Sequence, residues 1–240
     1  MNAARASVKF CRSRSSPRRY TRGVTDTETI DIVIVGAGGF GREVLQYVID
    51  AFGGDPRFTV KGFLDDAPPD LSAFDLSCPV LGDTATFRPG ANDRLVIAIG
   101  EPSVRARMAD RLGARGARFL TVVHPLAYVS DAATIGDGCI VAPFATIGAH
   151  ARLGDHSVLT FYASIGHDAT VGRFCALSPH SVTNGGSSIG DRAFLGTHAV
   201  VNPLQSVGDD AKVAAGAVVY RPVPPDSLAA GNPAKSRPRW

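Results

Sequence analysis

The sequence has no long apolar run, few aromatic residues and few cysteines. No uninterrupted hydrophobic stretch approaches the about 18 residues that a bilayer-crossing helix needs, so the sequence predicts a soluble protein without a membrane span. Aromatic residues make up 8% of the 240 residues, with a single Trp, which argues against a large aromatic-packed core. The cysteines show no CxxC spacing, so neither zinc nor a disulfide framework is indicated, and a reducing cytoplasm is expected: they are Cys11, Cys78, Cys139 and Cys175.

The body of the chain, residues 30–240, also lacks a large surplus of acidic or basic charge. The formal net charge is +3, but residues 1–29 carry seven Lys/Arg against two acidic residues, and the remainder carries 18 Lys/Arg against 20 Asp/Glu. The body is therefore not a basic nucleic-acid binder. We interpret 1–29 as a disordered basic extension. Its Arg- and Ser-rich composition also suits an organellar transit peptide, whereas a secretory signal is excluded because no apolar core is present.

The first half of the chain alternates strand and helix patterns. Apolar runs predict strands over 30–35, 58–64 and 95–99, an apolar stripe predicts a helix over 42–52, and a second helix is expected over 102–112, with 119–123 closing the unit. This alternation predicts a small parallel sheet, a Rossmann-like βαβ domain over 30–124, with its ligand at the carboxyl ends of the strands. The crevice there would be lined by 36–41, 65–66 and 100–101.

A glycine turn follows the first predicted strand. Gly36, Gly38 and Gly41 satisfy G-x-G-x-x-G, a pattern that lets the backbone approach an anionic ligand and points helix N–H groups at phosphate. About 95 residues suffice for one mononucleotide-sized half rather than for a full dinucleotide domain. We therefore favour a nucleotide or nucleotide sugar over NAD, with a tight packing turn as the alternative.

The second half carries a strict six-residue repeat. Stepping by six from Val129 to Val219 gives an aliphatic residue at every position except Thr183. The position two before is Ala, Ser or Cys except at Gln205, and Gly often follows. An α-helix cannot use this period, whereas three hexapeptides make one triangular coil of a parallel β-helix. Cys139 and Cys175 then lie two coils apart, about 9.6 Å, beyond disulfide reach.

Seven short motifs connect the two halves to a known family. Because of these motifs, residues 30–236 resemble the left-handed β-helix acyltransferases that modify sugars, namely the sialic acid O-acetyltransferase family and the bacterial nucleotide-amino-sugar N-acetyltransferases. The motifs are IVGAGGFGRE at 34–43, FLDD at 63–66, AIG at 98–100, HP at 124–125, GHD at 166–168, VPP at 223–225 and GNPAK at 231–235.

The resemblance implies a fold, a reaction and an assembly. The fold is an α/β N-terminal domain followed by a left-handed β-helix over 125–222 and a coenzyme A-proximal tail over 223–240. The reaction is acetyl transfer from the co-substrate acetyl-CoA, without a metal, to a nucleotide-linked amino sugar for polysaccharide synthesis, and the assembly is a homotrimer with active sites between subunits. The acceptor is alternatively a sugar hydroxyl, as in sialic acid O-acetylation.

The same resemblance assigns residues to roles. His167 is the general base and Asp168 orients it; the coil neighbours of this pair are small, which leaves room for substrate. A backbone N–H near Gly185 or Gly186 would stabilise the oxyanion. The sugar nucleotide is assigned to Gly36, Gly38, Gly39, Phe40, Asp65, Asp66 and Gly100, and acetyl-CoA to Gly185, Gly186, Gly231, Asn232, Pro233 and Lys235. Arg237 and Arg239 are further candidates for the phosphates of coenzyme A, with a solvated basic tail as the alternative.

Some residues depart from this pattern. Phe40 and Ala176 stand where some relatives have histidine, so acceptor contacts there are not carried over. His124 is expected to pack at the domain junction, His150 to lie below Asp168, and His180 and His198 to stack with Tyr162 at an exposed corner, while His156 has no predicted partner. A γ-type carbonic anhydrase is a rival, but its H-x4-H ligand pair is missing. A non-catalytic sugar-nucleotide scaffold is the third possibility.

Overall fold

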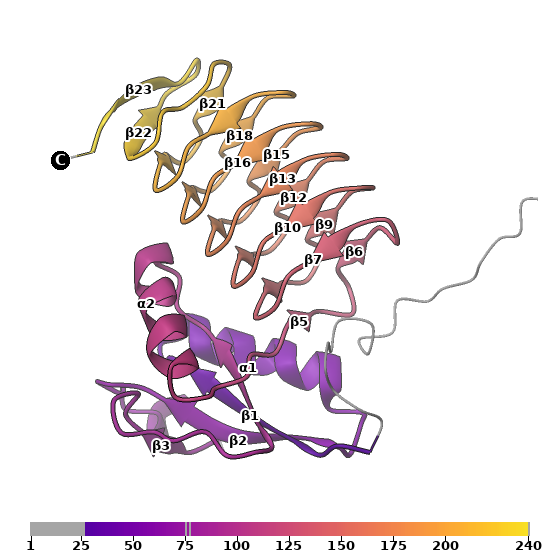
Figure 1. Ribbon diagram of the computed structural model, residues 1–240, viewed down its shortest axis with the longest axis vertical. Helices are drawn as coiled ribbons and strands as arrows, with labels where there is room; N and C mark the ends of the chain where they lie inside the picture. The colour runs from indigo at the N-terminus through magenta and orange to yellow at the C-terminus, as the bar shows by residue number, and fades with distance from the viewer. Residues whose placement is uncertain (1–26, 75, 77, 240) are drawn as a thin grey trace, which may run out of the picture.

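The computed structural model describes residues 27–74, 76 and 78–239, so nearly all of the predicted extension over 1–29, and Cys11, lie outside the described residues. The described chain has a small α/β unit followed by a β-solenoid (Figure 1). This confirms the predicted fold class. Within the described residues, no helix is both long and apolar enough to span a bilayer.

The α/β unit is a parallel sheet with a helix on each face. Its strands are ordered β3-β2-β1-β4, with β1 at Ile30–Val35, β2 at Phe58–Leu64, β3 at Val80–Gly82 and β4 at Asp93–Ile97. One face packs on helix α1, Gly39–Phe52, and the other on helix α2, Pro102–Gly113. A 3-10 turn spans Ser72–Phe74. The predicted strands and helices exist, but α1 begins three residues early, β4 begins two residues early, and β3 was not predicted.

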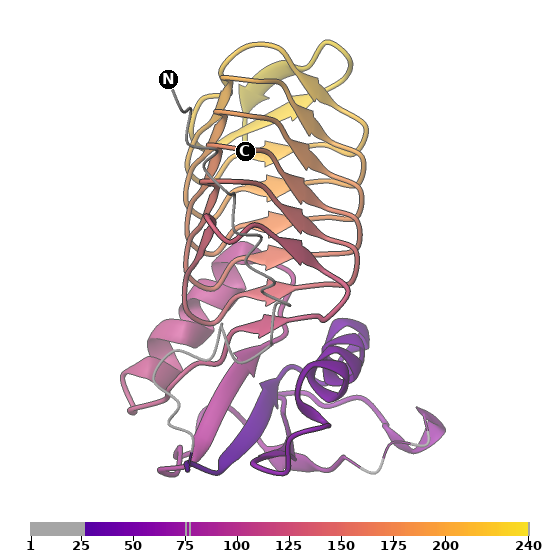
Figure 2. The ribbon, with the colours of Figure 1, turned by 90° about the vertical axis from the view of Figure 1, so that its right-hand side faces the viewer.

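Short strands, of two residues each except in the final hairpin, stack into the three faces of the solenoid (Figure 2). One face pairs β5 Val122–Val123, β8 Ile140–Val141, β11 Val158–Leu159, β14 Ala176–Leu177, β17 Phe194–Leu195, β20 Lys212–Val213, β22 Ser227–Ala230 and β23 Lys235–Pro238. The second pairs β6 Tyr128–Val129, β9 Thr146–Ile147, β12 Ser164–Ile165, β15 Val182–Thr183, β18 Val200–Val201 and β21 Val218–Val219. The third pairs β7 Thr134–Ile135, β10 Arg152–Leu153, β13 Thr170–Val171, β16 Ser188–Ile189 and β19 Ser206–Val207.

The solenoid extends past both of its predicted limits. Its first rung, β5, pairs with β8, although 122–123 were assigned to the α/β domain. At the other end, β22 pairs in parallel with β20, and β23 folds back antiparallel on β22. Within the predicted tail over 223–240, residues 227–238 therefore form a hairpin that closes one face. The strands at both ends continue the hydrogen-bonded ladder without the strict six-residue repeat. The repeat alone therefore did not predict them.

The repeat positions fill the interior of the prism. From Ile135 on, the aliphatic residues of the six-residue column are buried, and from Cys139 on, the small residues two positions before them are buried as well, including Ala163 and Cys175; Ala127, Val129 and Ala133 at the first coil are partly buried. The three described cysteines are free thiols, as predicted. Thr183 is the exception in the column: it is 0% exposed, and its hydroxyl has no hydrogen-bond partner among the described residues.

Thr183→Val is expected to stabilise the fold by about 1 kcal/mol, because valine keeps the shape and removes an unpaired buried hydroxyl. Thermal and urea unfolding measure the change. Ser157→Ala is the matched comparison, because the Ser157 hydroxyl donates to Gly172 O at 2.8 Å and accepts the Cys175 N–H at 2.9 Å. Ser157→Ala should lower the stability, because it removes both of these hydrogen bonds. A lower midpoint for Thr183→Val would contradict the prediction.

Candidate active site

The His167–Asp168 pair lies at a solenoid corner directly after β12. Asp168 adopts a left-handed backbone conformation, φ 58°, which turns the chain and brings its carboxylate back to the preceding imidazole. His167 Nδ1 lies 2.8 Å from Asp168 Oδ2. This contact selects the tautomer in which Nδ1–H donates to the carboxylate, so Nε2 keeps its lone pair. The side chains are 74% and 62% exposed, so the pair lies at the surface of the solenoid.

Glycine makes room for this imidazole on the next coil. A Cβ atom at Gly185 would lie 2.6 Å from His167 Nε2 and 2.7 Å from Cε1, so the ring rests where any side chain at 185 would stand. The Gly186 N–H donates to the His167 carbonyl at 3.0 Å. Among the described residues, the Gly185 N–H has no such acceptor. Of the two predicted oxyanion donors, Gly185 is therefore the available one.

The predicted crevice residues meet at one edge of the sheet. The three segments 36–41, 65–66 and 100–101 follow β1, β2 and β4, which end together because the strands are parallel. A Cβ at Gly36, φ 104°, would lie 2.9 Å from Ala98 O, and one at Gly41 would lie 1.9 Å from Gly36 O, so these two glycines serve close packing. Gly38 and Gly39 meet nothing within 4 Å and leave the start of α1 open.

The two aspartates of the crevice hold its loops. Asp65 accepts the Ala37 N–H at 2.7 Å, which ties the glycine turn to the end of β2. Asp66 accepts the Thr84 N–H at 2.7 Å, and this hydrogen bonding lowers the pKa of its carboxyl. Beside the turn, the Arg42 guanidinium lies 3.8 Å from the centroid of the Phe74 ring, a contact that no sequence motif predicted. Phe40 is half-buried and packs against the core around α1.

The predicted coenzyme A residues lie at two levels of the solenoid, after β15 and around the turn at the end of the face that carries β21. The turn 231–234 connects β22 to β23 and binds the end of that face, since Val218 N–H donates to Gly231 O at 3.0 Å and Ala234 N–H donates to Val218 O at 2.8 Å. Gly185 follows β15 on the same face. β12, β15, β18 and β21 are consecutive rungs, and the turn pairs with β21 as the next one, so four rung spacings, about 19 Å, separate the coil of His167 from the turn.

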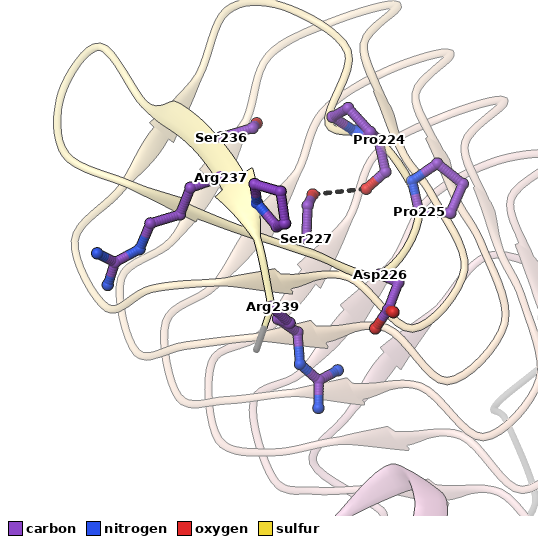
Figure 3. A pocket seen from close by; sticks show the side chains of 8 residues that line it. Pro224, Pro225, Asp226, Ser227, Ser236, Arg237 and Arg239 are labelled. Carbon is purple, nitrogen blue, oxygen red and sulfur yellow. Dashed lines mark hydrogen bonds between the residues drawn. The ribbon is translucent and has the colours of Figure 1, made fainter.

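A cavity of about 310 Å³ lies beside this hairpin (Figure 3). Pro224, Pro225 and Asp226 line one side, and residues 236–239 of β23 and its end line the other. Arg239 donates from Nη1 to Asp210 O at 2.6 Å, while Arg237 extends away from Pro224 and Pro225 in Figure 3. Lys235 is exposed on β23 and is not part of the lining.

The other histidines have structural surroundings. Tyr162, His180 and His198 stack with ring centroids 4.8 Å apart at each step, which confirms the predicted corner column. His124 accepts the Leu126 N–H on Nδ1, so its Nε2–H donates to Asp50 at 3.0 Å. The side chain packs at the domain junction as expected. His156 is buried between Phe119 and Phe174, and burial lowers its pKa to about 4. His150 has no hydrogen bond or ion pair to Asp168 in the described structure.

Comparison with known proteins identifies the arrangement. The sequence matches the PglD N-terminal domain over residues 31–112 and the hexapeptide repeat of succinyl-transferase over 187–221. The crystal structure of a perosamine N-acetyltransferase from Caulobacter crescentus, a histidine variant in complex with CoA and GDP-perosamine, is 32% identical, with a TM-score of 0.79, and the match covers 87% of this chain and 97% of that chain. This chain belongs to the hexapeptide-repeat sugar N-acetyltransferase family.

Two further relatives agree with this family. The acetyltransferase domain of PglB from Neisseria gonorrhoeae FA1090, in complex with acetyl coenzyme A, is 26% identical, with a TM-score of 0.77 over 87% of this chain and 100% of that domain. UDP-N-acetylbacillosamine N-acetyltransferase of Bacillus subtilis (strain 168) is 34% identical over 116 residues, which are 46% of this chain and 50% of the relative. The match thus spans half the length of that curated relative. As a member of the family, the chain is an acetyltransferase.

Within its described residues, no group of three or more His, Cys, Asp or Glu side chains is arranged to hold a metal ion.

Proposed function

We propose that this chain transfers the acetyl group of acetyl-CoA to the amine of a nucleotide-linked amino sugar, with His167 as the general base. The observation that carries the chemistry is the exposed imidazole whose Nδ1 is held by Asp168 and whose Nε2 lies beside Gly185. The similarity to a perosamine N-acetyltransferase crystallised with CoA and GDP-perosamine supports the substrate class. The open start of α1 supports binding of the nucleotide phosphates in the crevice.

The proposed reaction needs one proton relay. The neutral amine attacks the thioester carbonyl while Nε2 of His167 takes its proton, and Asp168 stabilises the imidazolium that results. The Gly185 N–H donates to the oxyanion of the tetrahedral intermediate. As the intermediate collapses, the carbon–sulfur bond breaks and the imidazolium returns the proton to the coenzyme A thiolate. The products are the amide and free coenzyme A, and His167 is again neutral.

Acetyl-CoA is proposed to extend along the face that carries β12, β15, β18 and β21. Its acetyl group would lie at His167, and its phosphate end would approach the turn 231–234 and Lys235. Gly185, which follows β15 one rung beyond His167 and carries no side chain, supports this arrangement.

A second copy of the chain is proposed to complete the site. With side chains 74% and 62% exposed, the His167–Asp168 pair of one chain does not exclude water from a reactive thioester. A homotrimer with active sites between subunits would supply the missing wall. The free thiols Cys78, Cys139 and Cys175 suit a reducing compartment, and we propose the cytoplasm.

Thiol release with a panel of acceptors tests the activity. UDP-, GDP- and dTDP-linked amino sugars are each mixed with acetyl-CoA, and release of coenzyme A should exceed background for at least one of them, with an amide in the product by mass spectrometry. Sialic acid and the corresponding hydroxy sugars are the comparison. Transfer to a hydroxyl alone, giving a base-labile ester, would replace the proposed reaction by O-acetylation. Stoichiometric zinc without any thiol release would favour a lyase.

A further inference from the structure

Arg105 is a fully buried arginine whose acceptors are all backbone carbonyls. Its side chain lies in α2 and is 0% exposed. Nε donates to His156 O at 2.7 Å, and Nη2 donates to Phe174 O at 2.7 Å and to Cys175 O at 2.8 Å. Nη1 donates to Ile99 O and, at 3.1 Å, to Gly100 O. Burial lowers the pKa of the guanidinium to about 10, so it stays charged near neutral pH.

These acceptors come from two functionally distinct parts of the molecule. Ile99 and Gly100 follow β4 at the rim of the crevice. His156 and Phe174 occupy the same corner on successive coils, and their rings stack with centroids 5.0 Å apart. The chain between them is one coil of the solenoid, and that coil contains His167. Arg105 therefore holds both ends of the coil that carries the base and, with the same planar group, the rim of the crevice.

Arginine is chemically suited to this task and lysine is not. A guanidinium presents donors in a fixed planar fork, so one rigid group meets three backbone segments at set distances. A lysine ammonium is a single point with three donors, and it cannot reach all three segments at once. Cationic attraction to a carboxylate is not the reason for the residue, because none of its five acceptors is a carboxylate.

We propose that Arg105 is a positioning residue that sets the crevice-bound nucleotide sugar at its distance from the coil of His167. The proposal rests on the function given above. It assigns Arg105 no contact with substrate: the residue acts through the backbone of 99–100 on one side and of 156 and 174–175 on the other. Misplacement of reacting groups by about 1 Å costs as much as 10²-fold in rate, so a tether of this kind affects turnover more than binding.

Arg105→Lys tests the proposal, because it keeps the charge and part of the hydrogen bonding. Its kcat, normalised to sites that bind coenzyme A, is expected to fall about tenfold, while KM for the nucleotide sugar stays within about twofold of the parent value. Lys212→Gln is the control. Lys212 also joins the two parts, through Glu101 at 3.2 Å, but this pair is exposed and lies outside the coil of His167. Its kcat should be unchanged.

A second measurement on the parent protein does not depend on the variant folding. Hydrogen exchange is followed with UDP, GDP and dTDP as probes. The bound nucleotide should slow exchange at 36–41 and also at 156–175, but not at 193–210. Protection confined to 36–41, or a folded Arg105→Lys with normal kcat per site, would overturn this proposal alone. A parent protein that neither binds a nucleotide nor releases thiol would contradict the proposed function, and this proposal with it.

Discussion

Replacing His167 with Ala is expected to lower kcat for acetyl transfer on the order of 10²- to 10⁴-fold, the range that a positioned general base contributes. The fold should be unaffected, because the side chain is 74% exposed and its hydrogen bond to Asp168 lies on the surface. Binding of coenzyme A and of the nucleotide sugar should persist. Steady-state thiol release, with calorimetry of both ligands, measures the two effects separately.

Two further variants limit the interpretation of that loss. Asp168→Asn should cause a smaller loss, since it weakens the hydrogen bond that holds Nδ1 at 2.8 Å but leaves the imidazole in place. His180→Ala removes another exposed histidine, one stacked between Tyr162 and His198, and should keep parent activity. If His167→Ala turned over at near-parent rates, His167 would not be the base.

The strands of the solenoid were predictable because their physical cause is local and repeated. One large aliphatic side chain must fill the prism at every sixth residue, and a small residue must fit beside it, so each rung repeats the same constraint. From Val129 to Val219 every predicted position falls in a short strand. The gathering of the loops around the predicted crevice was predictable for a related reason: parallel strands bring their carboxyl ends to one edge, which gathers Gly36, Asp65 and Gly100.

Contacts between distant segments left no such pattern. Arg105 looks in the sequence like any helical arginine, and only the packing of α2 on the solenoid buries it against 156 and 174–175. Asp65 and Asp66 were assigned to the substrate from the resemblance and from their place after a strand; that both also accept backbone N–H groups of neighbouring loops could not be predicted. The turn 231–234 matched a motif, but its hydrogen bonds to Val218 depend on how the last coil closes.

Gly185→Ala is expected to reduce kcat about 10²-fold without loss of stability, because the new methyl group and the base compete for one position. The added Cβ would lie 2.6 Å from Nε2, far inside van der Waals contact. The backbone at 185 is not in the left-handed region, so alanine itself introduces no strain there. The atoms that must yield belong to an exposed imidazole, which rotates away at little cost to the fold. Moving the ring carries Nε2 away from the acceptor and stretches the bond to Asp168.

This variant separates the position of the base from its presence. Gly185→Ala retains His167 and Asp168, so a general loss of charge or of a titrating group cannot explain its effect. Gly54→Ala is the matched control, since a Cβ there meets nothing within 4 Å and the residue is remote from the pair. The thermal midpoints of both variants should match that of the parent, while thiol release should fall only in Gly185→Ala. Parent-like turnover in Gly185→Ala would mean that the reactive nitrogen does not operate from above this glycine, and the oxyanion donor would have to be sought elsewhere.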